Sequence, residues 1–164
     1  MLSLYIHIPY CVRKCPYCGF YSTQFTQKNA DEFISALRRE AEGYQTEFCN
    51  RVLRTIYIGG GTPTVLSELQ LTEAIDIIRN YFHISEDAEI TVEANPNSVT
   101  KENLAVLRER GVNRLSLGVQ SFSAKILQTL GRLHTVAEAE NSFHLARNAG
   151  FQNIGIDLMY GIPE

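Results

Sequence analysis

The sequence lacks any apolar run near the roughly 20 residues that a membrane-spanning helix needs. Its first residues, MLSLYIHIPY, lack the cationic region and the small-residue cleavage site of a signal peptide. It also lacks a basic stripe, and its net charge of -3 gives no long-range attraction for phosphate backbones. We therefore expect a cytoplasmic protein that does not bind nucleic acid.

Low-complexity tracts and linkers rich in proline and serine are absent as well, so nothing marks a second domain. The 164 residues are 45% hydrophobic and 20% charged, as in ordinary globular proteins, and they suffice for one contiguous core. Residues 1–164 are therefore expected to form one domain.

Short β-branched runs alternate with amphipathic helical stretches, which indicates an α/β fold in which βα units build a parallel sheet. Five strands are expected, at residues 2–8, 55–58, 89–94, 114–119 and 153–158. Apolar residues at helical spacing predict helices that pack on this sheet. The residues that define these helical faces are Phe33, Leu37, Ala41 and Tyr44; Leu71, Ile75, Ile78 and Phe82; Leu104 and Leu107; and Ala139, Phe143 and Ala146.

The last residues, IDLMYGIPE, read as a strand that runs into a loop, and this loop should lead to a further helix. A parallel sheet whose last strand has no covering helix leaves apolar surface and an unpaired edge. We therefore expect the chain to be the N-terminal part of a longer protein.

Three of the four cysteines, Cys11, Cys15 and Cys18, have the spacing C-x3-C-x2-C after the first expected strand. Because cytosolic thiols stay reduced, metal binding or redox chemistry explains this cluster better than disulfides do. A zinc site would need a fourth ligand, which would have to be His7 or the distant Cys49. A 4Fe-4S cluster held by three thiolates would instead leave one iron open to a substrate, and the spacing favours it. The lone Cys49 is expected to be a small buried hydrophobe outside the site.

Polar residues follow the expected strands, and in a parallel sheet the loops at the carboxyl ends of the strands line the ligand crevice. The second strand ends in GGGTPT at residues 59–64. Its glycines would let the backbone approach a ligand and present N–H groups to a carboxylate, although a plain tight turn is the alternative. The loop is not a phosphate loop, because the lysine and serine or threonine of that motif are missing.

Glu93 lies near the end of the third expected strand and shares one face with Glu89 and Thr91. A carboxylate inside a barrel needs a partner, and an amino or hydroxyl group of a ligand would serve; a solvated strand end is the alternative. Gln120 falls at the ligand rim at the end of the fourth expected strand. For Arg132 and Asp157, ligand contact and a charge-paired structural role are equally compatible with the sequence.

Six motifs, in order and spacing, resemble one branch of the radical-SAM superfamily: YIHIPYC, GGGTPT, VEANP, RLSLGVQSF, LGRLH and IDLMYGIP. This branch comprises the oxygen-independent coproporphyrinogen III dehydrogenases and the HemW-type heme chaperones. The resemblance covers essentially the whole chain. It implies a partial (β/α)6 barrel, with five βα units visible and the C-terminal part absent.

The resemblance also implies a 4Fe-4S cluster on Cys11, Cys15 and Cys18 and a bound S-adenosylmethionine. An electron donor reduces the cluster, which then cleaves the sulfonium of the cofactor reductively. Tyr5 matches a residue that packs by the cofactor, and residues 60–62 match the stretch that meets its methionyl amino and carboxylate groups. The full set of expected cofactor-site residues is Tyr5, Phe20, Gly60, Gly61, Thr62, Glu93, Gln120, Arg132 and Asp157.

Phe20 separates the two members of the branch. The dehydrogenases resemble C-x3-C-x2-C-x-C, whereas this chain has Cys18-Gly19-Phe20, as in the heme chaperones. A heme chaperone is therefore the first expectation, with heme and a heme-acceptor protein as partners. The alternatives are a coproporphyrinogen III dehydrogenase, a related radical methyltransferase and a zinc-binding structural module. The HNxxYW signature associated with heme binding has no counterpart in these 164 residues.

Overall fold

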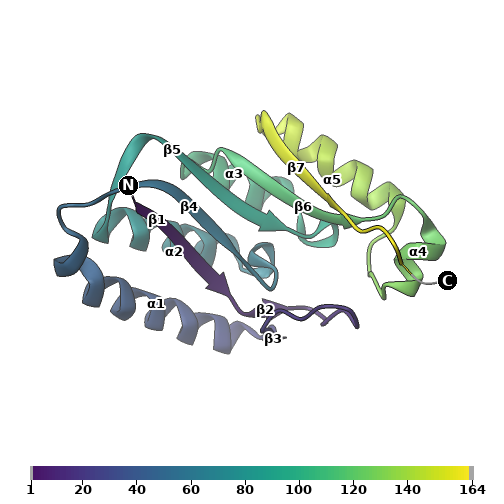
Figure 1. Cartoon of the computed structure of the whole chain (residues 1–164), viewed down its shortest axis with the longest axis horizontal. Coiled ribbons are helices and arrows are strands. Elements are labelled where there is room, and N and C mark those ends of the chain that lie inside the picture. Colours follow the sequence, from purple (N-terminus) through teal and green to yellow (C-terminus); the bar gives the residue numbers. More distant parts are fainter. Residues whose placement is uncertain (1, 163–164) are drawn as a thin grey trace.

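The computed structural model describes residues 2–162, and its main feature is a sheet of five parallel strands (Figure 1). The strands lie side by side in chain order: β1 (Leu2–Ile8), β4 (Val52–Gly60), β5 (His83–Ala94), β6 (Arg114–Gln120) and β7 (Asn153–Leu158). Every strand that the sequence predicts is present. The α/β prediction is confirmed.

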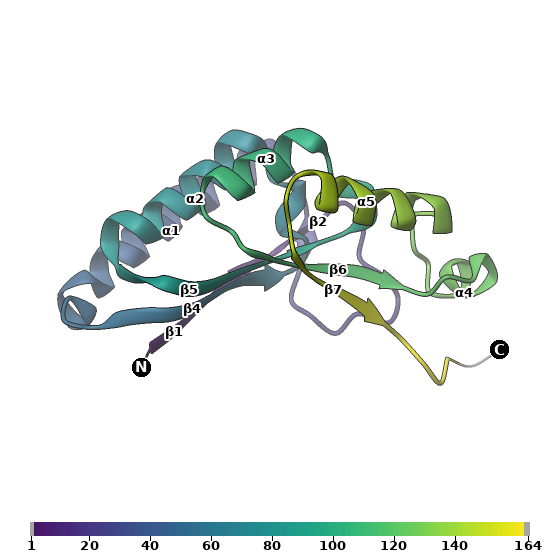
Figure 2. The same cartoon turned by 90° about the horizontal axis from the view of Figure 1, so that it is seen from above.

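Helices connect successive strands: α1 (Gln27–Phe48), α2 (Glu68–Tyr81), α3 (Lys101–Glu109), and the pair α4 (Ala124–Thr129) and α5 (Val136–Asn148). Figure 2 shows α1, α2, α3 and α5 on one face of the sheet, and within residues 2–162 no helix covers the other face. Parallel crossovers are almost always right-handed, so a chain that always adds its next strand on the same side lays every helix on the same face. This is the winding of a βα barrel and not of a doubly wound sheet.

The helices begin where the sequence provides a cap. The side chains of Thr26, Ser67, Thr100 and Thr135 each accept a hydrogen bond from the backbone N–H three residues later, and in α1, α2, α3 and α5 the side chain of that later residue caps in return. The short helix α4 was not predicted, because its six residues bury only Leu127 and show no helical period.

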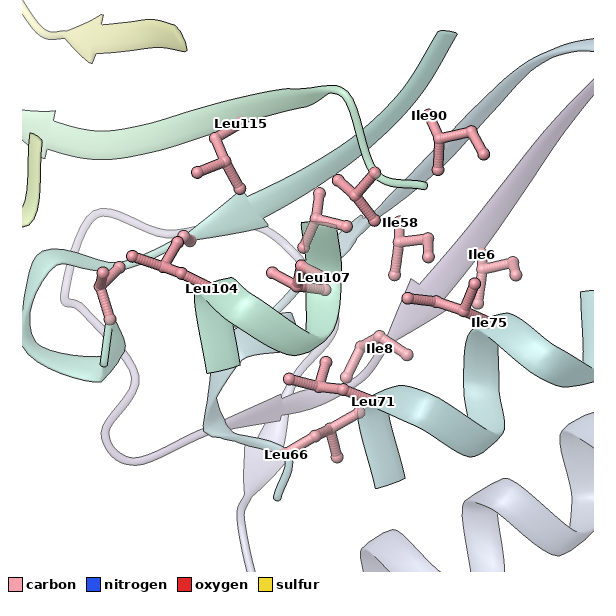
Figure 3. Close-up of a cluster of buried hydrophobic side chains, with 14 of the residues drawn as sticks. Ile6, Ile8, Ile58, Leu66, Leu71, Ile75, Ile90, Leu104, Leu107 and Leu115 are labelled. Atoms are coloured by element: carbon pink, nitrogen blue, oxygen red, sulfur yellow. The ribbon is translucent and has the colours of Figure 1, made fainter. Parts of the chain in front are cut away.

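The core lies between the sheet and this helical layer, where apolar side chains from both interlock (Figure 3). Alternate residues of each strand point into it, for example Ile6 and Ile8 of β1 and Leu115 and Leu117 of β6. The face of the sheet without helices carries mainly polar side chains. They include Ser3, Tyr5, His7, Thr55, Tyr57, Glu89, Thr91, Glu93, Arg114, Ser116 and Asp157.

The expected bare apolar surface on the last strand is present, although the face of the sheet that lacks helices is polar. On the edge strand β7, Ile156 is 38% and Leu158 is 58% exposed. Among residues 2–162 no helix is long and apolar enough to cross a membrane.

Two residues at the end of α1 also differ from the prediction. Tyr44 was expected to pack on the sheet but is 47% exposed and contacts Phe48 instead. Cys49, expected to be buried, is exposed at the C-cap of this helix. The cause is the length of α1, because its last buried residue is Ala41 and its final two turns project past the core.

Candidate functional site

The three clustered cysteines lie on a loop that leaves the carboxyl end of β1. The short strands β2 (Tyr10–Cys11) and β3 (Thr23–Gln24) pair in parallel and close the base of this loop. Within it the N–H of Cys18 donates to the carbonyl of Cys15 at 3.0 Å. All three thiols are free and partly exposed. One short loop therefore presents three sulfur donors at the end of the sheet.

The glycine-rich loop after β4 lies directly against the base of the cysteine loop. The N–H of Gly61 donates to the carbonyl of Ile8 and that of Thr62 to the carbonyl of Tyr10, both at 2.8 Å. A Cβ on Gly61 would lie 2.5 Å from the Tyr10 carbonyl oxygen, so only glycine allows this approach. The Thr62 hydroxyl lies 3.6 Å from the sulfur of Cys11.

The prediction that this loop offers free N–H groups to a ligand is wrong. The N–H groups of residues 61 and 62 donate to backbone carbonyls, and that of Gly60 donates to a carboxylate oxygen of Glu93 at 3.0 Å. These donors face the ends of the two neighbouring strands, and the partners lie between 33 and 53 positions away in the sequence. The glycines therefore join the strand ends tightly at the site.

Glu93 projects from β5 with both carboxylate oxygens occupied. One accepts the N–H of Gly60, and the other accepts the hydroxyl of Tyr57 at 2.7 Å. Burial, and then the hydrogen bond to this carboxylate, raise the pKa of Tyr57 well above its usual value. The ring of Tyr5 stacks on that of Tyr57, and its hydroxyl lies 2.9 Å from Nδ1 of His7. Tyr5 is thus linked to Glu93 through Tyr57.

Two residues from the last strands complete this part of the rim. Gln120, at the end of β6, has a φ of 70° and is the non-glycine residue with a positive φ among those that the structure describes. Such a conformation costs on the order of 1–3 kcal/mol and tends to occur at functional sites. Asp157 of β7 accepts a hydrogen bond from the Ser116 hydroxyl, at 3.1 and 3.2 Å to its two oxygens.

Arg132 lies between α4 and α5 and reaches across the end of the sheet to the cysteine loop. One guanidinium nitrogen donates to the carbonyl of Gly118 at 2.6 Å. The other lies 3.4 Å from the sulfur of Cys15 and 3.5 Å from the hydroxyl of Tyr17. Burial raises the pKa of Tyr17, and the charge of Arg132 opposes that rise.

These groups line one open pocket at the carboxyl end of the sheet. It contains every residue predicted for the site except Tyr5, whose ring stacks on that of Tyr57. The pocket also includes residues that were not in the predicted cofactor site: Arg13, Lys14, Tyr17, Ser22, Ala94, Asn95, Ser116 and Gly118. Ser116 and Gly118 could have been found, because a period of two places them on the same strand face as Gln120.

The residues present suit a thiolate-bound cluster and a polar cofactor. The thiols are reduced, they share one pocket, and a cationic side chain lies beside one of them. Three buried polar atoms of lining residues, Oγ of Ser22, Oδ1 of Asn95 and Nε of Arg132, have no hydrogen-bond partner in the part of the chain that is described. Such atoms call for an explanation, and a bound polar group is one. Within residues 2–162, no three His, Cys, Asp or Glu side chains are grouped as around a single metal ion.

A parallel βα sheet with a C-x3-C-x2-C loop at its carboxyl end is the arrangement of one large class of proteins. The family model described as the Radical SAM superfamily matches residues 5–164, and the chain belongs to this family. Membership implies the use of S-adenosylmethionine and a 4Fe-4S cluster.

Within this family, the chain is similar to two kinds of protein. The chain is 44% identical to "Heme chaperone HemW" of Bacillus subtilis over 164 residues, which cover 99% of this chain and 43% of that protein. It is 36% identical to "Oxygen-independent coproporphyrinogen III oxidase" of Salmonella typhimurium, covering 99% of this chain and 36% of the relative. Among solved structures, coproporphyrinogen III oxidase (HemN) of Escherichia coli superimposes with a TM-score of 0.91 at 35% identity, over 98% of this chain and 37% of that one. The chain thus spans less than half the length of these relatives.

Proposed function

We propose that this chain forms the cofactor-binding part of a heme chaperone of the HemW type. The observation that carries this proposal is Phe20, which occupies the position where the dehydrogenases of the branch have a fourth cysteine. Phe20 is 63% exposed and lines the pocket two residues after Cys18. The higher identity to a HemW protein, 44% against 36% for a coproporphyrinogen III oxidase, supports the same assignment.

In this proposal Cys11, Cys15 and Cys18 hold the 4Fe-4S cluster as thiolate ligands. Such a cluster would supply one electron for the reductive cleavage of S-adenosylmethionine into methionine and a 5′-deoxyadenosyl radical. The role of the chain's own side chains is to orient the cofactor and to enclose it. Glu93, Gln120, Arg132 and Asp157 surround the pocket with a carboxamide, a guanidinium and two carboxylates, which suit the amino, carboxylate and ribose hydroxyl groups of the cofactor.

The partners proposed for the complete protein are heme, a heme-acceptor protein and an electron donor. Ligation by thiolates requires reduced cysteines, which supports a cytoplasmic location. Phe20 is exposed and offers no ligand atom, so the proposal gives this chain one cluster with three protein ligands.

The test is to reconstitute the protein with iron and sulfide under anaerobic conditions and to assay heme binding and transfer beside porphyrinogen oxidation. We expect four irons per chain, the broad absorption of a 4Fe-4S cluster, and no conversion of coproporphyrinogen. Phe20→Cys serves as the matched variant, and it should retain the cluster without gaining dehydrogenase activity, because substrate recognition depends on further residues. Colourless protein that contains zinc would instead support the zinc-binding alternative.

A second candidate function is oxygen-independent coproporphyrinogen III oxidation, which the TM-score of 0.91 to HemN favours. The two candidates differ in product, since only the oxidase converts coproporphyrinogen. Turnover of this substrate by the wild-type protein would overturn the chaperone assignment while leaving the cluster and cofactor assignments intact.

A further inference from the structure

Two arginines cross between the cysteine loop and the segment that joins α4 to α5. Arg13, on the cysteine loop, donates to the backbone carbonyl of Gly131. Arg132, on the joining segment, donates in the opposite direction to the sulfur of Cys15 at 3.4 Å. The two side chains therefore tie the same pair of segments together, but only one of them ends on a sulfur atom.

The guanidinium of Arg132 is held in place from its other side. Its second terminal nitrogen donates to the Gly118 carbonyl at 2.6 Å, and the Tyr17 hydroxyl lies 3.5 Å from the nitrogen that faces the sulfur. The side chain is partly buried, and its Nε is buried with no hydrogen-bond partner among the described residues. A planar group fixed at two points cannot easily turn away from Cys15.

A cationic donor beside a thiolate has a definite effect on an iron–sulfur cluster. Hydrogen bonds to the cluster sulfurs, net charge and solvent exposure set its reduction potential. A guanidinium withdraws electron density from the thiolate and stabilises the more negative, reduced state, so it raises the potential. The effect is stronger in a partly buried pocket, where water screens the charge less.

We propose that Arg132 is a positioning residue that donates a hydrogen bond to the Cys15 thiolate and raises the reduction potential of the cluster, in addition to any contact with S-adenosylmethionine. This proposal rests on the proposed function to the extent that it requires a cluster on the three cysteines. It assigns to Arg132 a role that exists before the cofactor binds, which separates it from a role in cofactor recognition alone.

The experiment is a redox titration of the reconstituted protein without S-adenosylmethionine, with dithionite as the one-electron reductant and electron paramagnetic resonance of the reduced cluster as the signal. Arg132→Gln should shift the midpoint downward, with a tenfold lower reduced-to-oxidised ratio at a fixed potential, equivalent to about 59 mV for a one-electron couple. Arg132→Lys keeps the positive charge but cannot donate from two terminal nitrogens at once. Its midpoint potential should therefore lie between those of Arg132→Gln and the wild type.

Arg13→Gln is the matched control, because it removes the opposite tie between the same segments without removing a donor to sulfur. Because Arg13 lines the pocket but donates to a carbonyl and not to sulfur, its loss should shift the midpoint clearly less than Arg132→Gln does. If both variants shift the potential equally, or if Arg132→Gln carries a full cluster at the wild-type potential, the inference is wrong. If Arg132→Gln does not load iron, the midpoint potential of Arg132→Lys becomes the deciding measurement. A midpoint equal to that of the wild type, with both measured without S-adenosylmethionine, would also refute the direct hydrogen bond. A wild-type protein that takes up no cluster at all would refute the proposed function instead.

Discussion

Replacement of Gly61 by alanine should damage the junction between the glycine-rich loop and the cysteine loop. The new Cβ would lie 2.5 Å from the carbonyl oxygen of Tyr10 and 2.9 Å from its nitrogen and carbonyl carbon, and all three are backbone atoms. Because no flexible side chain can yield, one of the two loops must move. Overpacking of this kind costs about 1–3 kcal/mol.

The displacement would also weaken two backbone hydrogen bonds, from the N–H of Gly61 to the carbonyl of Ile8 and from the N–H of Thr62 to the carbonyl of Tyr10. Each contributes about 1 kcal/mol. We therefore expect Gly61→Ala to lower the free energy of unfolding by about 3 kcal/mol, the lower end of the sum of the overpacking and hydrogen-bond terms. For a chain of this size that corresponds to a fall in Tm of roughly 6–12 °C. Iron uptake should fall with it, because the base of the cysteine loop would shift.

Thermal unfolding of the apo protein, followed by circular dichroism, measures the first effect. Gly43→Ala is the control, because this glycine lies within α1 and its Cβ would meet nothing within 4 Å. Alanine is favoured over glycine in a helix interior by roughly 0.5–1 kcal/mol, so this variant should be slightly more stable than the wild type. A Gly61→Ala protein that melts at the wild-type temperature and loads iron normally would show that the two loops are not packed as described.

Other predictions concern individual side chains of the site and the fold. Cys15→Ala should abolish iron binding, whereas Cys49→Ala should leave the iron content unchanged, because Cys49 is exposed and outside the pocket; equal losses on anaerobic iron analysis would contradict the three-ligand site. The folded-state pKa of Tyr57 is raised, so its neutral hydroxyl stabilises the fold below the unfolded pKa near 10, and this stabilisation is lost as the pH rises above that value. In denaturant unfolding between pH 8 and pH 11, the free energy of unfolding should accordingly fall less for Tyr57→Phe than for the wild type. An equal fall with pH in both proteins would argue against the hydrogen bond to Glu93. Thr135→Ala removes the cap of α5 and should lower the free energy of unfolding by about 1 kcal/mol, with a Thr135→Ser variant close to the wild type.

The strands could be predicted because each has a β-branched run, but their extent could not. The sequence indicates a third strand from residue 89, whereas β5 begins at His83. Its early residues, ISEDA, are largely polar and do not alternate clearly. They extend the strand because Val52 and Leu53 pair with His83 and Ile84 through the backbone, and backbone pairing leaves no trace in side-chain type.

The site was predictable where one segment carries the signal, as in the cysteine loop. It was less so where the contact joins distant segments. The donors of the glycine-rich loop seemed free for a ligand, because nothing in the local sequence reveals that Ile8, Tyr10 and Glu93 accept them. The same holds for Arg132, whose position suggests a rim residue but whose contact with Cys15 spans 117 positions.

This dependence on distant contacts has a consequence for how the cluster and the fold support each other. The cysteine loop is fixed from three directions: by β3 at its base, by the glycine-rich loop through Thr62, and by the joining segment through Arg132. None of these contacts can exist in an unfolded chain, so the three thiols are brought together with their cationic neighbour only when the sheet has formed. A ligand that binds only the native state stabilises it by mass action, as metal sites assembled by folding do. Cluster binding should therefore stabilise the packing of the loops around β1, β4 and β6 together. The same reasoning explains why the end of α1, which contacts none of these loops, can leave Tyr44 and Cys49 exposed without affecting the site.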